Sequence, residues 1–206
     1  MARQPIGWLR TQANRNTRQE ILQAAAMLFS KQGYVGTSLV DIAKIVGIKA
    51  PSLYNHFKTK NEILFTYIVD GINALYDVCL QNVTEAKDTA QDKLYAYVFS
   101  HTLSLLESQE TSTLSGQHHL NENFMLPEQL EQTNALQKKQ VRLLKDILMR
   151  GKSDGVFQIT DITVTTFFIM GAVEHSIYWF QKEARLSEKD VAHLVAENAL
   201  ALVKKP

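Results

Sequence analysis

Residues 38–64 read SLVDIAKIVGIKAPSLYNHFKTKNEIL, and this stretch decides the fold. Its apolar residues recur at helical spacing in two short runs, separated by Gly47 and a turn over residues 48–50. Pro51 stands near the first turn of the second run, where a missing N–H costs nothing. Two short helices joined by a few residues with a glycine are the helix-turn-helix arrangement. The stretch therefore predicts a helix-turn-helix whose second helix covers residues 51–57.

Polar side chains occupy the face of this second helix that its apolar residues leave open. They are hydrogen-bond donors and one aromatic ring: Lys49, Ser52, Tyr54, Asn55 and His56. Such side chains suit the phosphates and base edges of DNA. We therefore expect this face to contact double-stranded DNA.

A further helix precedes the pair, and a basic arm precedes that helix. Thr17 and Glu20 form a capping-box pattern, and Gly33 ends the helical run. We therefore expect a three-helix DNA-binding domain over residues 17–62, with an arm over residues 1–16. Two interpretations of the arm stay open, because basic arms can enter an adjacent minor groove and terminal segments are often without a role.

Charge divides the chain in the same way. Residues 1–60 hold nine Lys and Arg against two acidic residues, a net charge of +7. Residues 61–206 hold 13 basic and 19 acidic residues, a net charge of −6. This asymmetry favours a polyanion as the partner of the N-terminal segment alone.

Composition limits the class of protein. The chain has 206 residues, of which 45% are hydrophobic, and its single cysteine is Cys79. One cysteine excludes an internal disulfide and a thiolate zinc site. No uninterrupted apolar run reaches the ~18 residues of a membrane span, and the N-terminus lacks the apolar core of a signal peptide. We expect a soluble cytoplasmic protein without a membrane partner.

The remainder of the chain, residues 63–206, predicts an all-α body. Helical spacing is found over residues 61–86, 90–110, 127–152, 161–182 and 187–203, and residues 111–123 suggest a short irregular helix. The run over 161–182 is apolar nearly all round, which is typical of a buried helix. The fold class is therefore all-α, an N-terminal helix-turn-helix domain followed by a helical bundle.

Residues 17–64 resemble the TetR family of bacterial regulators. The residues that carry the resemblance are Ile21 to Ala25, Phe29, Gly33-Tyr34, Thr37, Ile42-Ala43, Gly47-Ile48 and Ser52 to Leu64. Lys49 and Pro51 depart from the family pattern, where Ser and Gly are frequent. The resemblance implies an all-helical homodimer whose C-terminal domain binds a small-molecule effector.

The resemblance also implies roles for single residues. Thr37 and Ser38 match positions that often meet phosphate, Ser52, Tyr54 and His56 match the reading helix, and Lys60 matches a backbone contact. Together with the donors named above, the expected DNA-binding set is Thr37, Ser38, Lys49, Ala50, Pro51, Ser52, Tyr54, Asn55, His56 and Lys60.

The body offers candidates for an effector pocket and for the dimer interface. The pocket candidates form a mostly apolar set, Phe99, Leu103, Phe124, Met125, Phe167, Met170 and His175, which suits a hydrophobic ligand. A faint similarity around residues 151–157 and Trp179 points to acyl-CoA or lipid-like effectors. The last two helices usually pair in the family dimer, and the interface candidates are Ile177, Tyr178, Trp179, Val191 and Leu194.

Catalytic, cofactor and metal sites are not expected. The chain has no G-x-S-x-G, phosphate-binding glycine loop or H-E-x-x-H motif, and His118, His119 and Glu122 lack a further ligand cluster. The best interpretation is a regulator, most simply a repressor, that binds a palindromic operator and is released by an effector. An architectural DNA-binding protein and an all-helical enzyme remain the alternatives.

Overall fold

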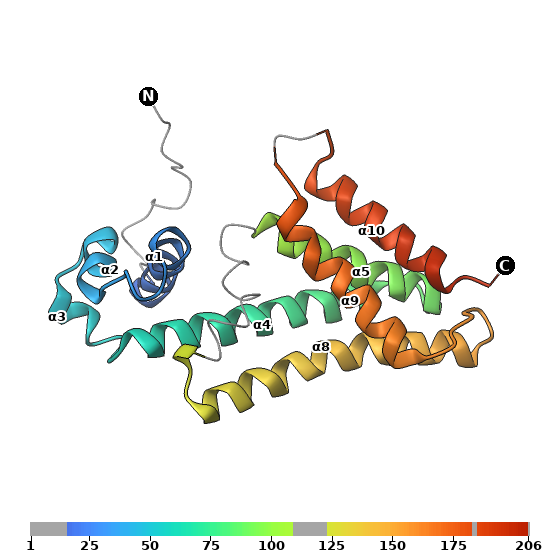
Figure 1. Cartoon of the computed structure of the whole chain (residues 1–206), viewed down its shortest axis with the longest axis horizontal. Coiled ribbons are helices and arrows are strands. Elements are labelled where there is room, and N and C mark those ends of the chain that lie inside the picture. The colour runs from blue at the N-terminus through green and yellow to red at the C-terminus, as the bar shows by residue number, and fades with distance from the viewer. Residues whose placement is uncertain (1–15, 109–122, 183–184, 206) are drawn as a thin grey trace. The chain divides into compact units, whose positions relative to one another are not determined.

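The computed structural model describes residues 16–108, 123–182 and 185–205 (Figure 1). Residues 1–15 of the predicted arm lie outside these ranges. So do residues 111–122 of the expected irregular helix, among them His118, His119 and Glu122. The chain divides into two compact units, Met1–Leu64 and Phe65–Pro206, which we call the head and the body. The described regular elements are all helices, as predicted.

The head contains three helices with well-defined ends. Helix α1 (Thr17–Gln32) is capped by Asn16, whose side chain accepts from the Gln19 amide, so the expected capping box of Thr17 with Glu20 is wrong; the helix ends before Gly33. Helix α2 (Leu39–Val46) begins at Ser38 with a capping box to Asp41 and ends at Gly47 in the left-handed conformation, φ 76°. Helix α3 (Ala50–Leu53) follows a turn and carries Pro51 in its first turn. The order is that of a helix-turn-helix.

Helix α3 is shorter than expected. We predicted a helix over residues 51–57, but regular helix ends at Leu53 and residues 54–56 form turns. The His56 and Phe57 amides both donate to the Leu53 carbonyl, at 2.9 and 3.0 Å. Phe57 is thereby drawn into the head interior, fully buried, while residues 54–56 stay exposed.

The body is a bundle built around α5. Its helices are α4 (Lys60–Glu85), which begins in the head, α5 (Ala90–Glu107), α8 (Pro127–Ser153), α9 (Ile162–Trp179) and α10 (Glu188–Val203). Helix α5 packs against α8, α9 and α10. The main core includes Leu94, Tyr97, Leu144, Leu148 and Val173, all fully buried.

Helix α4 is long and apolar, and its mean hydropathy reaches 1.5 over 18 residues. By length and composition it is the one helix of the described chain that could cross a membrane. Its most buried side chains follow helical spacing, Ile63, Leu64, Ile68, Ile72, Cys79 and Val83. This spacing is that of an amphipathic helix with one face in a protein core.

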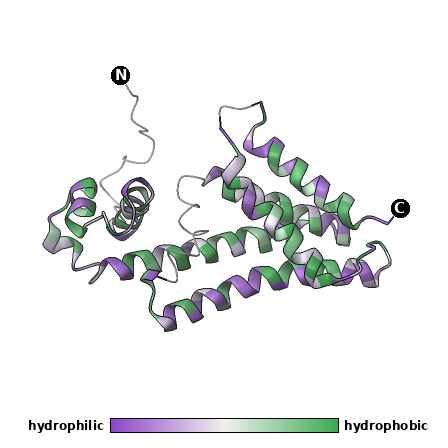
Figure 2. Cartoon of the chain, viewed as in Figure 1, coloured by the Kyte–Doolittle hydropathy of each residue, from purple (hydrophilic) through white to green (hydrophobic). Residues whose placement is uncertain are grey.

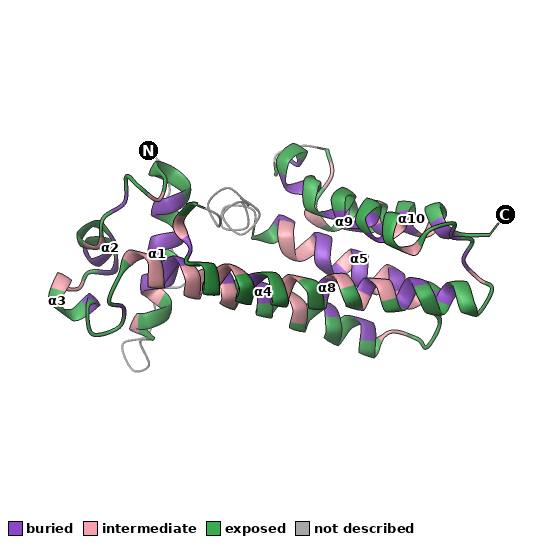
Figure 3. Ribbon diagram, turned by 60° about the horizontal axis from the view of Figure 1, so that its bottom comes forward, coloured by how far each residue is buried: buried purple, intermediate pink, exposed green. Residues whose placement is uncertain are grey.

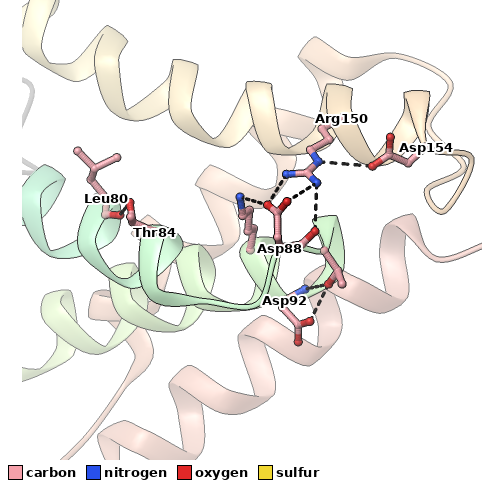
Figure 4. Close-up of polar contacts among 8 residues, drawn as sticks. Leu80, Thr84, Asp88, Asp92, Arg150 and Asp154 are labelled. Atoms are coloured by element: carbon pink, nitrogen blue, oxygen red, sulfur yellow. Dashed lines mark hydrogen bonds and ion pairs between the residues drawn. The ribbon is translucent and has the colours of Figure 1, made fainter.

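Polar contacts fix the end of α8 to the start of α5 (Figure 4). The Arg150 guanidinium donates to the Asp88 carboxylate at 2.7 Å and to the Asp88 carbonyl at 3.1 Å. Lys93 donates to the same carboxylate. These two cations hold the pKa of Asp88 well below its usual range. Arg150 directly precedes Gly151, whose backbone packs closely against the Phe157 ring in the core.

The prediction that residues 161–182 form a buried helix is wrong for one side of α9. Val164, Phe167, Phe168, Tyr178 and Trp179 are each more than half exposed. Apolar residues run along the helix in Figure 2, and exposed ones along it in Figure 3. The sequence shows that this face is apolar, and in the structure its side chains remain exposed among the described residues.

Candidate nucleic-acid interface

The exposed end of the helix-turn-helix carries the side chains that we expected to contact DNA. Pro51, Ser52, Tyr54, Asn55 and His56 are exposed, as is Lys49 at the N-cap of α3. Ala50 is partly exposed. Among the described residues, the side chains of Ser52, Tyr54, Asn55 and His56 have no hydrogen-bond partner. These groups are therefore available to a ligand outside the chain.

Buried neighbours hold this surface in place. Ile42, Ala43 and Val46 on α2 and Leu53 and Phe57 beyond the turn are buried, so both helices are anchored through their inner faces. The Gly47 amide donates to the carbonyls of Ala43 and Lys44, which closes α2 before the turn. A left-handed residue at this point is most easily a glycine.

Ser38 lies at the N-terminus of α2 with its hydroxyl committed to the cap. The Asp41 amide donates to Ser38 Oγ at 3.1 Å, and the Ser38 amide donates to the Asp41 carboxylate at 3.1 Å. The Ser38 hydroxyl also donates to the Asp41 carboxylate, and this hydrogen bond, together with that from the Ser38 amide, lowers the pKa of Asp41. Ser38 remains exposed at the positive end of α2, which favours an anion, but the proton of its hydroxyl is already donated to Asp41.

Thr37 does not present its side chain to DNA. The residue is 1% exposed, and its hydroxyl donates to the Gly33 carbonyl at 2.8 Å. The expected phosphate contact is therefore incompatible with the position of this side chain, which instead closes the loop after α1.

Lys60 is likewise engaged within the head. Its ammonium group donates to the Tyr34 carbonyl at 2.6 Å and to the Thr37 carbonyl at 2.7 Å, and it lies 4.4 Å from the centre of the Tyr34 ring. Burial lowers the pKa of this ammonium group. The structure engages Lys60 in the packing of the loop over residues 34–37, and the phosphate contact that we expected stays a prediction.

Three contacts in the head were not predicted. Thr59 Oγ1 accepts from the Glu62 amide at 3.0 Å, and the Glu62 carboxylate accepts from the Lys58 amide at 2.7 Å. The T-x-x-E pattern at residues 59–62 is a capping-box pattern and could have predicted these two contacts. The Arg18 guanidinium lies 4.7 Å from the centre of the Phe57 ring, and no spacing rule could have paired residues so far apart.

The expected effector residues do not form one site. Phe99 stacks on Tyr95 at 5.7 Å, and Met170 accepts from the Tyr97 hydroxyl inside the core. Met125 is buried, and Leu103 and Phe124 are partly buried. Phe167 and His175 lie exposed on α9, and His175 is the one member of the set that lines the open groove found between α9 and α10 in the described part of the chain.

The expected dimer residues also separate into two groups. Ile177 and Val191 are 5% and 2% exposed and pack with Leu106 and Phe180 in a core cluster, so they offer almost no surface to a second copy. Tyr178, Trp179 and Leu194 are exposed. A groove of about 410 Å³ between α9 and α10 lies beside them, and its lining includes Phe168, Trp179 and Leu202.

Family comparison matches both units. Residues 87–203 match the model of the tetracyclin repressor-like C-terminal domain, and residues 21–66 match that of bacterial regulatory proteins of the tetR family. The chain belongs to the TetR family. It is therefore a regulatory protein with a helix-turn-helix, and the resemblance first seen over residues 17–64 extends through the body.

Relatives and solved structures of the TetR family cover nearly the whole chain. The HTH-type transcriptional repressor KstR2 of Mycolicibacterium smegmatis is 28% identical over 187 residues, 90% of this chain and 88% of KstR2. PfmR from Thermus thermophilus is 25% identical with a TM-score of 0.79, covering 90% of this chain and 99% of PfmR.

The structure of AibR in complex with isovaleryl coenzyme A and operator DNA shares the same fold. It matches with a TM-score of 0.78 and 24% identity, covering 88% of this chain and 97% of AibR.

Proposed function

We propose that this TetR-family protein is a cytoplasmic repressor that binds a palindromic operator as a dimer and is released by a small hydrophobic effector in the body. The observation that carries the DNA-binding part is the exposed, unpaired set Ser52, Tyr54, Asn55 and His56 at the end of the helix-turn-helix. Exposed Lys44, Lys49 and Lys58 surround it with positive charge. DNA is the polyanion that such a surface fits.

We propose a revised DNA-binding set, supported by which side chains of the head are exposed. Base-edge contacts are assigned to Ser52, Tyr54, Asn55 and His56, with Ala50 and Pro51 bringing the backbone close. Phosphate contacts are assigned to Lys49 and to the positive N-terminus of α2 beside Ser38. In a dimer, two copies of residues 50–56 would enter successive major grooves, about one helical turn apart or somewhat more.

Dimerisation is supported by the exposed side of α9. Its residues 164, 167, 168, 171, 172, 175, 178 and 179 recur every three or four positions and form one stripe along the helix. The stripe carries several aromatic rings, and aromatic residues are enriched in protein–protein interfaces. Leu194 and Leu202 add apolar surface from α10. We propose this stripe and the adjoining groove as the surface that pairs with a second copy.

Repression and effector release are supported by the relatives. KstR2 is named a transcriptional repressor, and AibR was solved with an acyl-coenzyme A and operator DNA together. By analogy, effector binding in the body would tilt α4 and change the spacing of the two heads. A ligand can do so only through its different affinity for the two arrangements.

The experiment starts by sequencing genomic fragments that the protein retains and then titrates a labelled duplex carrying the selected site. We expect at least a thousandfold preference for that site over random DNA of equal length. Octanoyl-CoA is then added to the complex, and release supports the effector class. Equal affinity for both duplexes would instead identify an architectural protein, and retention of neither would contradict DNA binding.

A further inference from the structure

Two neighbouring buried polar groups on α5 have no partner within the described part of the chain. His101 is 2% exposed and Thr102 is fully buried, and neither His101 Nδ1 nor Thr102 Oγ1 has a hydrogen-bond partner there. Other buried hydroxyls of the body donate within their own helices, among them Ser100, Thr133, Thr166 and Ser176. An unpaired buried polar group destabilises a protein, so these two need an explanation.

His101 lies on the same face of α5 as Tyr97, one turn away. The two rings meet edge to face, with centroids 5.6 Å apart. The Tyr97 hydroxyl donates to the Gln140 carbonyl at 3.2 Å and to Met170 Sδ at 3.4 Å, and the Gln140 amide donates to the Ile72 carbonyl at 3.4 Å. Helices α4, α5, α8 and α9 therefore converge next to His101.

This interior carries no charge of its own. None of the Lys, Arg, Asp and Glu residues in the described ranges is buried. Burial lowers the pKa of His101 to about 4, so its imidazole is neutral at pH 7. The charge that acts on Tyr97 from α9 is negative, that of Glu174. A carboxylate or phosphate placed here would lose its hydration without gaining a counter-charge.

We propose that His101 Nδ1 is the polar anchor of the effector site and hydrogen-bonds an uncharged oxygen, a hydroxyl or a carbonyl, on an otherwise apolar ligand. The proposal rests on the proposed function and assigns the chemistry of its effector. A neutral imidazole can accept from a hydroxyl through Nδ1 in one tautomer and donate to a carbonyl in the other. Binding then repays the cost of burying the ring nitrogen in the free protein.

The direct test follows the imidazole ¹⁵N resonances of the full chain, assigned with His101→Phe, as eight-carbon probes are added. We expect 1-octanol to move the His101 Nδ1 resonance, and 2-octanone to do so if Nδ1 carries the proton. Octanoate should bind at least tenfold more weakly than 1-octanol. Binding of 1-octanol without movement of that resonance, or octanoate binding as tightly, would overturn the proposal.

Variants give a second readout that does not require the resonance. His101→Phe keeps a ring of similar shape, so the free protein should melt at the same temperature or higher while affinity for 1-octanol falls at least tenfold. His193→Phe is the matched control, because His193 Nδ1 already pairs with the Tyr95 hydroxyl at 2.8 Å, and its affinity for 1-octanol should be unchanged. Equal affinity in His101→Phe and wild type would contradict the proposal.

Operator binding separates this proposal from the proposed function. Movement of the His101 resonance by 1-octanol without any loss of operator affinity would support the anchor and contradict effector release. Absence of binding by both 1-octanol and 2-octanone, in a protein that still selects its operator, would overturn the anchor and leave DNA binding intact.

Discussion

The Lys60 ammonium group lies 4.4 Å from the centre of the Tyr34 ring and donates a 2.6 Å hydrogen bond to the Tyr34 carbonyl. A cation over an aromatic face with a carbonyl acceptor is a stabilising arrangement. It ties the first turn of α4 to the loop that follows α1, 26 residues earlier. The lysine that the sequence suggested for phosphate thereby supports the loop that leads into α2.

Two lysines of the head should therefore behave differently when replaced by alanine. Lys60→Ala should lower the free energy of unfolding by about 1–3 kcal/mol, because it removes the side-chain donor of the Thr37 carbonyl and leaves the Tyr34 carbonyl with the Thr37 amide alone. Lys49→Ala should leave stability unchanged and reduce the salt dependence of operator binding by about one unit. Urea titrations measure the stability of each variant, and operator binding at several salt concentrations measures the salt dependence. A reduced salt dependence in Lys60→Ala would show that Lys60 contacts phosphate.

Two tyrosines of the head provide a similar contrast. Tyr54 is 46% exposed, so Tyr54→Ala should leave the free energy of unfolding within about 0.5 kcal/mol of wild type. Loss of a base-edge contact should weaken operator binding by about 1–3 kcal/mol. The ring centroids of Tyr34 and Phe29 lie 5.2 Å apart. Because Tyr34→Ala removes this packing, it should mainly lower the free energy of unfolding. Unchanged operator affinity in Tyr54→Ala would remove Tyr54 from the interface.

Local patterns predicted the helices of the head because each signal acts over a few residues. Gly47 separates the two short helices, as the sequence indicated, and in the structure it ends α2 in the left-handed conformation. We predicted too long a third helix because the apolar residues Leu53 and Phe57 are four positions apart, as on one face of a helix. In the structure the Leu53 carbonyl accepts two amides, and Phe57 reaches the core from a turn instead.

Pairings between distant segments could not be read from spacing. Lys60 and Tyr34, or Arg150 and Asp88, meet only because the fold brings their helices together. Hydropathy also cannot distinguish an apolar side chain that is buried in the chain's own core from one that stays exposed on its surface. Ile177 and Trp179 are both apolar and two positions apart on α9, yet the first is 5% exposed and the second 53%.

The stripe on α9 predicts a dimer that a single charge should break. Trp179→Glu places a carboxylate in the proposed interface, where it would lose hydration without a partner. We expect the monomer mass by light scattering where the wild type gives a dimer, and at least tenfold weaker operator binding. Met149→Glu is the control, because Met149 is 43% exposed on α8 and is not a member of the stripe. A dimer that survives Trp179→Glu would place the interface elsewhere.

Gly151 is required by the ring that packs on it. A Cβ added to Gly151 would lie 2.0 Å from Cδ2 of Phe157, which is buried in the core. Gly151→Ala should therefore destabilise the body by about 1–3 kcal/mol despite the better helix propensity of alanine. Combining it with Phe157→Leu should cost less than the two single changes together. Additive losses would show that the ring does not cause the strain.

The buried imidazole of His101 makes stability depend on pH. Its pKa is lowered to about 4 by burial in the folded state, against about 6.5 in an unfolded chain. Between these values the unfolded state binds the extra proton, so the free energy of unfolding falls as the pH falls, by up to about 1.4 kcal/mol per pH unit.

Urea titrations of wild type between pH 7 and pH 4.5 should show this loss. His101→Phe cannot take up the proton and should flatten the profile over that range. His56→Phe makes the same substitution at an exposed position of the head, and its profile should follow the wild type. Because carboxylates are common to all three proteins, the difference between the two variants isolates the buried ring. Parallel profiles would mean that His101 is protonated without unfolding, and that the interior beside Tyr97 admits a charge.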